Sequence, residues 1–238
     1  MGQYSLLIDL DRCIGCHACS VACKIENNVQ LGSFWNSVVT VGPSGTFPDV
    51  KMYFLPVPCQ HCENPACVAA CPTGASHKEA NGVVLIDKDK CIGCQYCMMA
   101  CPFNVPAYEY DEPLTPRVMK CTMCHPQIES GELTMPGCVG ACPKEALVYG
   151  KRKDILKIAH ARIEAFPGRY VDHVYGETEM GGTNWLYLSG VPFKEIGMRE
   201  DLGVTSAPEL TSGALAVVPM VAAVWPALLG RIWAISKR

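Results

Sequence analysis

Residues 85–102 read Leu-Ile-Asp-Lys-Asp-Lys-Cys-Ile-Gly-Cys-Gln-Tyr-Cys-Met-Met-Ala-Cys-Pro, and this stretch decides the fold. Its four cysteines have the spacing C-x2-C-x2-C-x3-C, and a proline follows directly. In a run of this kind three thiolates hold one [4Fe–4S] cube and the fourth thiolate reaches a second cube. Close spacing lets a loop wrap one corner of a cube, whereas the helix that follows carries the fourth sulfur away. The stretch therefore predicts one half of a two-cluster module.

The same run, which resembles that of bacterial two-cluster ferredoxins, recurs along the chain with different gaps. Residues 7–16 repeat the pattern Leu-Ile-Asp-x-Asp-(Arg or Lys)-Cys-Ile-Gly-Cys of residues 85–94. In the fourth occurrence a loop over residues 125–137 stretches the middle gap. The sixteen cysteines thus form four sets: Cys13, Cys16, Cys19 and Cys23; Cys59, Cys62, Cys67 and Cys71; Cys91, Cys94, Cys97 and Cys101; and Cys121, Cys124, Cys138 and Cys142.

Composition narrows what so many cysteines can do. A chain of 238 residues has room for one large domain or two small ones with an appendage. Disulfide scaffolds are usually much shorter, so the remaining readings are zinc sites and iron–sulfur clusters, and the spacing favours clusters. The net charge of −3, with no basic stripe, argues against a nucleic-acid partner.

Two histidines complete a pattern that also occurs in c-type cytochromes. Cys13–His17 and Cys121–His125 both match the C-x-x-C-H haem-attachment motif. Each motif lies inside a complete set of four cysteines, and two thioether bonds would leave the other two thiols without a role. We therefore expect His17 and His125 to be surface residues or hydrogen-bond donors to cluster sulfurs. A haem stain on a denaturing gel tests the cytochrome alternative.

Hydrophobic patterns predict the elements that frame these sets, in an α+β fold. Apolar side chains at helical spacing predict a helix over 153–166, which Pro167 ends. Gly42-Pro43-Ser44-Gly45 is turn chemistry between two strand-like runs of an inserted hairpin. The expected strands are 4–8, 38–41, 50–55, 82–87, 146–149 and 185–188.

Residues 210–230 carry no charge and are mostly apolar. As a helix they span about 30 Å, the thickness of a hydrocarbon core, which predicts a transmembrane anchor over 210–232. Pro219 and Pro226 would kink this helix. The alternative is a helix buried against a partner.

Charges on either side of this span predict its orientation. Acidic residues precede it (Glu200, Asp201 and Glu209) and basic residues follow it (Arg231, Lys237 and Arg238). The positive-inside rule then places the C-terminus in the cytoplasm and the cluster domain on the periplasmic side of the inner membrane. Residues 1–12 lack the pattern of a signal peptide, so we expect export with a signal-bearing partner.

The order of the sets predicts which cysteines share a cluster. The second and third sets follow one another as in a ferredoxin, forming an inner module over 59–102. The first and fourth sets, joined across the termini, form an outer module of 1–23 plus 119–150, with 24–58 inserted. The fourth cysteine of each set crosses over. The predicted ligand sets are Cys13, Cys16, Cys19 and Cys142; Cys121, Cys124, Cys138 and Cys23; Cys59, Cys62, Cys67 and Cys101; and Cys91, Cys94, Cys97 and Cys71.

Taken over residues 13–143, the chain resembles the four-cluster, ferredoxin-like electron-transfer subunits of membrane-bound oxidoreductases. These include the DMSO-reductase superfamily, such as formate dehydrogenase and polysulfide or menaquinone reductase complexes, and periplasmic nickel–iron hydrogenases. Tyr175-Gly176-Glu177, Gly181-Gly182-Thr183 and Gly190-Val191-Pro192 extend the resemblance. It implies that the Cys13 cluster lies nearest the catalytic subunit and the Cys91 cluster nearest the membrane. Because Cys97 is present, it implies four cubes and no three-iron cluster.

The predicted function is therefore electron relay and not catalysis. No nucleophile–base pair, phosphate loop or spare metal set is recognisable in the sequence. Expected partners are a molybdopterin-type or hydrogenase-like catalytic subunit, a quinone-interacting membrane subunit and a cytochrome subunit, with residues 151–209 packing on partners. The alternatives are a zinc-stabilised scaffold and the same role in a cytoplasm-facing complex. Four basic residues lie beside the sets and are expected on the solvated surface, the alternative being that they raise cluster potentials: Arg12, Lys88, Lys90 and Lys120.

Overall fold

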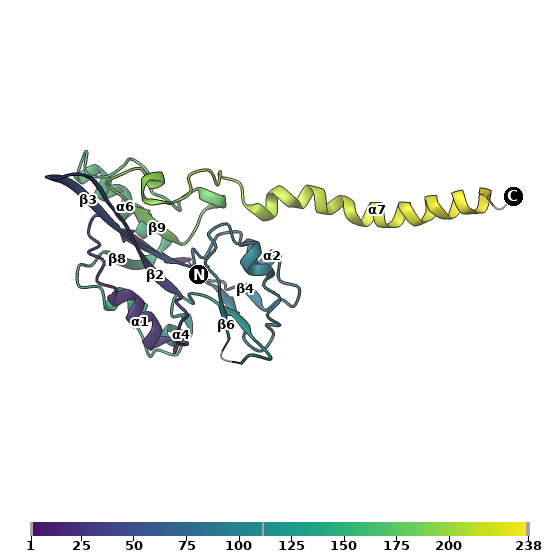
Figure 1. The fold of residues 1–238 in the computed structure, drawn as a ribbon, viewed down its shortest axis with the longest axis horizontal. Coiled ribbons are helices and arrows are strands. Elements are labelled where there is room, and N and C mark those ends of the chain that lie inside the picture. The colour runs from purple at the N-terminus through teal and green to yellow at the C-terminus, as the bar shows by residue number, and fades with distance from the viewer. Residues whose placement is uncertain (1, 111, 237–238) are drawn as a thin grey trace.

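The structure, a computed structural model, describes residues 2–110 and 112–236. It combines small sheets and short helices in one body, from which a single long helix projects (Figure 1). This confirms the α+β class. In chain order the elements are β1 (Tyr4–Asp9), α1 (Ala18–Glu26), β2 (Asn36–Thr46), β3 (Asp49–Pro58), α2 (Ala66–Ala69), β4 (Ser76–Lys78), β5 (Val84–Ile86), α3 (Tyr96–Met99), β6 (Ala107–Glu109), β7 (Arg117–Met119), α4 (His125–Glu129), α5 (Gly137–Gly140), β8 (Leu147–Lys151), α6 (Arg152–Ala165), η1 (Glu179–Gly181), β9 (Trp185–Leu188), η2 (Phe193–Ile196) and α7 (Ala207–Ser236).

A three-stranded sheet with the order β8-β1-β9 joins distant parts of the chain. β1 pairs antiparallel with β8, Leu6 opposite Tyr149, and parallel with β9, Leu6 beside Trp185. β1 is apolar on both faces because each face packs against a different layer, and Leu6 and Leu7 are both fully buried. The strands predicted at 4–8, 146–149 and 185–188 are confirmed within one or two residues.

Two apolar layers lie on opposite faces of this sheet. Leu6 and Ile8 face a cluster that includes Trp185, Tyr187 and the cysteine-bearing loops. Leu7 faces the other way, onto α6. The helical spacing predicted for α6 is confirmed, since Ile155 and Ala159 are buried and Leu156 and Ile163 half-buried. Phe166 lies at the C-terminal end of α6 and is exposed.

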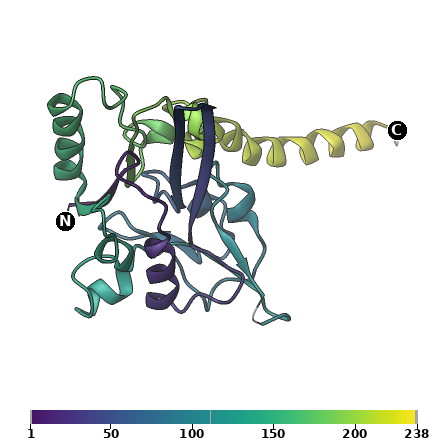
Figure 2. The same cartoon turned by 60° about the vertical axis from the view of Figure 1, so that its left-hand side comes forward.

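β2 and β3 form a long two-stranded ribbon, whose strands lie side by side in Figure 2 and whose tip extends away from the body in Figure 1. The turn predicted at residues 42–45 is wrong. Gly45 pairs with Val50, so the chain reverses at Phe47 and Pro48, and the register shifts between Val41 and Ser44. Glycine and proline are accommodated at such an irregularity because the ribbon has no further strand that needs their backbone groups.

Two smaller hairpins complete the body. β4 pairs with β5, as expected for the link between two halves of a module, with Ser76 opposite Ile86. β6 pairs with β7, Ala107 opposite Met119. This second hairpin was not predicted, because each of its strands has only three residues, too few to show a period.

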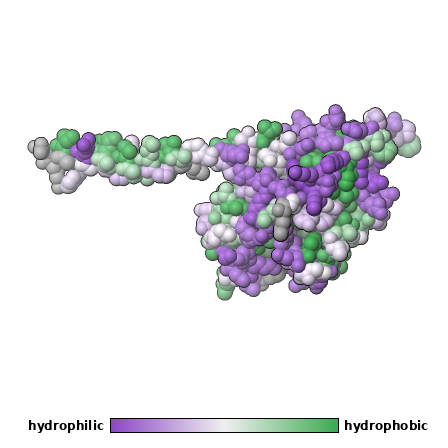
Figure 3. Space-filling view, turned by 180° about the vertical axis from the view of Figure 1, so that it is seen from behind, coloured by the Kyte–Doolittle hydropathy of each residue, from purple (hydrophilic) through white to green (hydrophobic). Residues whose placement is uncertain are grey.

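α7 is longer than the predicted span and stands clear of the body (Figures 1 and 3). From Glu209 onward every side chain that the structure describes is exposed. In residues 2–110 and 112–236, it is the one helix long and apolar enough to cross a membrane. Pro219 and Pro226 lie within it. Lys237 and Arg238, two of the charges used to predict the orientation, lie outside the described residues.

Candidate iron–sulfur sites

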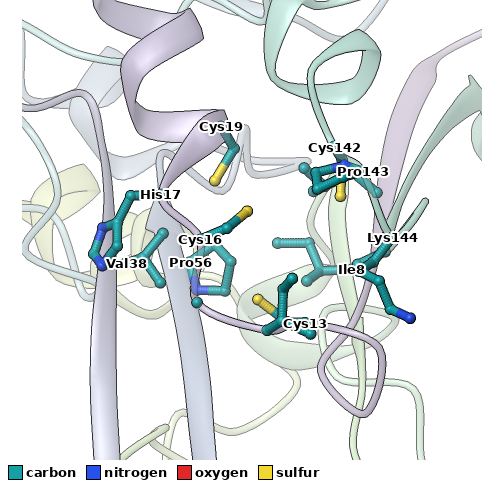
Figure 4. A pocket seen from close by; sticks show the side chains of 14 residues that line it. Ile8, Cys13, Cys16, His17, Cys19, Val38, Pro56, Cys142, Pro143 and Lys144 are labelled. Atoms are coloured by element: carbon teal, nitrogen blue, oxygen red, sulfur yellow. The ribbon is translucent and has the colours of Figure 1, made fainter.

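The first site brings together cysteines from the two ends of residues 13–142. Cys13, Cys16, Cys19 and Cys142 line one pocket, and Figure 4 shows their sulfur atoms turned into the same space. The loop after β1 and the first turn of α1 supply three of them, and the segment between α5 and β8 supplies the fourth. The pairing of β1 with β8 brings these segments together. Burial raises the pKa of the Cys13 and Cys19 thiols.

The backbone of the cysteine loops explains the repeated Cys-Ile-Gly-Cys sequence. Gly15 and Gly93 have φ values of +66° and +67°, in the left-handed region that favours glycine. The next residue but one, His17 in the first set and Gln95 in the third, is also left-handed and precedes a helix. His17 thus occupies a helix-start position that a glutamine fills equally well, and it is exposed.

The second site is the most buried. Cys23, Cys121, Cys124 and Cys138 are all buried, and their thiols influence one another electrostatically. Burial raises the pKa of Cys23 to about 12, and raises the pKa of Cys121 and Cys138 well above the usual value. Hydrogen-bond donors reach two of the sulfurs: Met123 N lies 3.3 Å from Cys121 Sγ, and Asn27 Nδ2 lies 3.6 Å from Cys124 Sγ.

In the third site, Cys62 is influenced by the thiols of Cys59, Cys101 and Cys67, in that order, and burial raises its pKa. These residues come from the loop after β3, from α2 and from the end of the turn after α3. Burial also raises the pKa of Cys101. Cys101 thus acts on a thiol of the second set, and its assignment to this site stays a prediction.

The fourth site is less complete in its contacts. Cys91 and Cys94 both act on Cys97, whose pKa burial raises to about 11. Cys71 and Cys91 pack against the same apolar cluster, to which Cys97 belongs. Burial pushes the pKa of Cys71 upward, but hydrogen bonds outweigh it and lower the pKa, chiefly from Ser76 N at 3.4 Å from Sγ.

Thiols of different sites also act on one another electrostatically. Cys19 of the first site acts on Cys23 of the second. Cys59 of the third site acts on Cys121 of the second, and Cys67 of the third acts on Cys97 of the fourth. Since such effects fall with distance, each of these pairs of sites lies close together.

The donor chemistry of these sites suits iron–sulfur cubes. Each site offers four thiols, and His17 also lines the pocket of the first site. A structural zinc ion needs four ligands about 2.0–2.3 Å from one point. Among the residues that the structure describes, no three His, Cys, Asp or Glu side chains converge in that way. In a cube each thiolate binds a different iron, so its ligands are spread around a larger body.

Comparison with known proteins gives the same picture. Residues 12–75 and residues 50–152 each match a 4Fe-4S dicluster domain. A protein of Nitratidesulfovibrio vulgaris strain Hildenborough is 49% identical over 99% of this chain and 67% of its own length. Hydrogenase-2 operon protein HybA of Escherichia coli O157:H7 is 33% identical over 90% of this chain and 76% of its own. The chain belongs to the family of ferredoxin-like iron–sulfur electron-transfer subunits of oxidoreductase complexes.

A further family member, the thiosulfate reductase electron transfer subunit PhsB of Salmonella typhi, is 44% identical over 63% of this chain and 76% of its own length. Two dicluster domains imply four [4Fe–4S] clusters, in agreement with the sixteen cysteines. The family resemblance and the cofactor predicted from the sequence are thereby confirmed.

One expectation about the surroundings of the sites is wrong. Arg12, Lys88 and Lys90 are exposed, as predicted, but only 2% of Lys120 is accessible to solvent. Lys120 directly follows two buried residues of β7 and precedes buried Cys121, so the chain has no route to the surface there. In the sequence, the one indication of this burial is the apolar pair Val118-Met119 directly before Lys120.

Proposed function

We propose that this chain relays electrons through its four clusters between a catalytic subunit and a quinone-interacting membrane subunit of a respiratory oxidoreductase. A row of four-thiol sites, which lie close together in pairs, carries the proposal, because a series of neighbouring one-electron carriers provides a path. The bound cubes supply the redox chemistry. Every cysteine belongs to a set, so no thiol is left over for substrate chemistry.

The ligand sets of this proposal are those predicted from the order of the cysteines. The β1–β8 pairing supports a module closed across the termini. The common pocket of the first site, and the action of Cys101 on Cys62, support the crossover within each module. The sets are Cys13, Cys16, Cys19 and Cys142; Cys23, Cys121, Cys124 and Cys138; Cys59, Cys62, Cys67 and Cys101; and Cys71, Cys91, Cys94 and Cys97.

The protein's own part is to bury and orient the carriers. Met123 N, Asn27 Nδ2 and Ser76 N each direct a donor at a ligand sulfur. Hydrogen bonds to sulfur, burial and local charge are the means by which a protein sets cluster potentials. Because hydrogen bonding, burial and local charge differ between the sites, each cluster of the relay has its own reduction potential.

The printed names of the relatives indicate the class of partner. A hydrogenase operon protein and a thiosulfate reductase subunit favour a hydrogenase-like or molybdopterin-type catalytic partner at the Cys13 end of the row. The exposed apolar side chains of α7 favour a membrane beside the body. We place the cluster domain on the periplasmic side, exported with a signal-bearing partner and joined by a cytochrome subunit.

Metal analysis of the anaerobically purified chain tests the core of this proposal. We expect iron and sulfide close to sixteen atoms each, from four cubes of four irons. The brown colour should bleach with dithionite, whereas zinc sites are colourless and redox-silent. Zinc in place of iron would overturn the proposal.

A cysteine variant tests the proposed ligand sets. Cys142→Ser should disturb the EPR signal of the cluster held by Cys13, Cys16 and Cys19. Loss of the Cys121 cluster alone would show that the crossover is assigned incorrectly.

Protease accessibility tests the orientation. Protease added to intact cells with a permeabilised outer membrane should digest the cluster domain. Full protection would instead place that domain in the cytoplasm.

A further inference from the structure

Lys120 is the one Lys or Arg side chain buried in residues 2–110 and 112–236. Its ammonium group donates to two backbone carbonyls, those of Val84 and Cys121, the latter at 3.3 Å. No carboxylate pairs with it among the described residues. A lysine is almost never fully buried unless it is paired, because an ammonium loses its hydration on burial.

The position of Lys120 indicates what balances this charge. It precedes Cys121 of the second site, and it is bonded to Val84 of β5. The charge on Lys120 also acts on the thiols of Cys62 and Cys67, lowering the pKa of each against the effect of burial. Val84 N in turn donates to Nδ1 of His61, the residue that directly precedes Cys62 of the third site. The ammonium group thus faces the third site from the side of the second.

The neighbouring imidazole of His61 does not balance the charge of Lys120, because a histidine ring is neutral or positively charged. His61 is fully buried, and its Nδ1 accepts a hydrogen bond from Val84 N at 2.9 Å. Nδ1 is therefore unprotonated, and a neutral ring carries its proton on Nε2. Val84 thus bridges two side chains, donating to His61 and accepting from Lys120.

We propose that Lys120 is a positioning residue whose buried positive charge raises the reduction potential of the cluster held by Cys59, Cys62, Cys67 and Cys101. The proposal rests on the ligand sets proposed above. Four thiolates around a cube leave the site negatively charged, and each electron accepted adds one more negative charge. A fixed cation nearby stabilises the reduced state more than the oxidised state, and burial prevents solvent from screening it. Electrons are thereby held at the centre of the row.

Redox titration followed by EPR tests this in the intact chain. Lys120→Met removes the charge and keeps much of the side-chain volume. We expect the midpoint potential of one cluster to fall by at least 59 mV, which corresponds to a tenfold change in the reduced-to-oxidised ratio of a one-electron couple. The other three potentials should move less. Lys120→Arg, which keeps the charge, should restore most of the potential.

Lys88→Met is the matched control, because Lys88 is exposed and lies beside a different set. It should leave all four potentials unchanged. Lys120→Gln serves as the second charge-removing variant if Lys120→Met does not accumulate. Unchanged potentials in a charge-removing variant would overturn the inference, as would an equal fall in all four. Absence of four cluster signals in the unmodified chain would instead refute the proposed function, so the two failures are distinguishable.

Discussion

At the scale of single residues, the cluster loops depend on positions that carry no ligand. A Cβ added to Gly93 would lie 2.3 Å from the carbonyl oxygen of Pro116, a backbone atom that cannot turn aside. At Gly15 the same atom would meet the ring of Phe54 at 2.3 Å. The glycine of Cys-Ile-Gly-Cys is therefore required both by its left-handed φ and by the segment packed against the loop.

Gly93→Ala should accordingly lower iron content and stability. Backbone strain alone costs roughly 1–3 kcal/mol, and the clash with Pro116 O adds to it. Gly203→Ala is the matched control, because Gly203 has a φ of +66° but nothing within 4 Å of an added Cβ. Iron analysis and the melting temperature of both variants measure the difference. Equal effects of the two substitutions would show that the close approach to Pro116 is unimportant.

A second residue-scale feature fastens α6 to the central sheet. Asp9 is fully buried, and its Oδ2 accepts hydrogen bonds from Arg162 Nη1 at 3.1 Å and Tyr170 Oη at 2.9 Å. Arg162→Met should destabilise the chain by roughly 3–5 kcal/mol, because it leaves a buried carboxylate without its cation.

Arg169→Met is the control for this prediction. Arg169 pairs with Asp11 at 3.2 Å, but nearly half of its side chain is exposed. Removing an exposed partner should cost far less than removing Arg162, because solvent screens the pair. Anaerobic thermal unfolding should rank the two variants in this order, and the reverse order would contradict the role given to Asp9.

At the scale of elements, α7 is the part of the chain that the body needs least. It leaves the body after Ser206, which is fully buried and whose Oγ accepts a hydrogen bond from Asn64 Nδ2 at 2.8 Å. Beyond Glu209 the described side chains are exposed. The hydrogen bond that holds the last loop to the body is thus made before α7 begins.

A stop codon after Ser206 should release the chain from the membrane without emptying its sites. When the chain is expressed without partner subunits, we expect the full-length form in the membrane fraction and the truncated form in the soluble fraction. Both should have the same iron content and visible absorbance. Loss of iron on truncation would show that α7 supports the fold and is more than an anchor.

At the scale of the whole molecule, the body has two kinds of interior. On the face of the β8-β1-β9 sheet that packs against α6, Leu7, Ile155 and Leu186 belong to an apolar core without ligand cysteines. The core on the other face of the sheet includes Cys19, Cys121 and Cys138, and the cluster beneath the fourth site combines Cys23 and Cys97 with Trp35, Ile86, Val118 and Met119. These two interiors therefore contain cysteines proposed to hold the cofactors, whereas the core under α6 does not.

Removal of iron should unfold these two regions unequally. After anaerobic chelation we expect amide exchange to become fast over residues 59–119, while β1, β9 and α6 stay protected. Hydrogen–deuterium exchange of the loaded and stripped chain measures this directly. Uniform loss of protection over the whole body would show that the sheet also depends on the clusters.

The sequence could predict what is local and could not predict what depends on distant packing. Cysteine spacing gave the four sets, and apolar runs predicted β1, β8, β9 and α6. The prediction of a turn at residues 42–45 was wrong, because the glycine and proline lie within the paired strands β2 and β3, where the register shifts. Burial of Lys120 depends on β5, which lies 36 positions away in the chain at Val84, so the sequence offered only the apolar pair before Lys120 as a signal.

The pairing of the first strand with β8 has a consequence for biosynthesis. Cys13, Cys16 and Cys19 leave the ribosome early, but Cys142, which lines the same pocket, is translated more than a hundred residues later. The inner run of cysteines emerges in between, as one continuous segment. Assembly machinery thus meets the innermost pair of sites first and can close the outermost site only when most of the polypeptide has been made. In a chain that stalls before residue 142, Cys13, Cys16 and Cys19 lack the fourth cysteine of their proposed set.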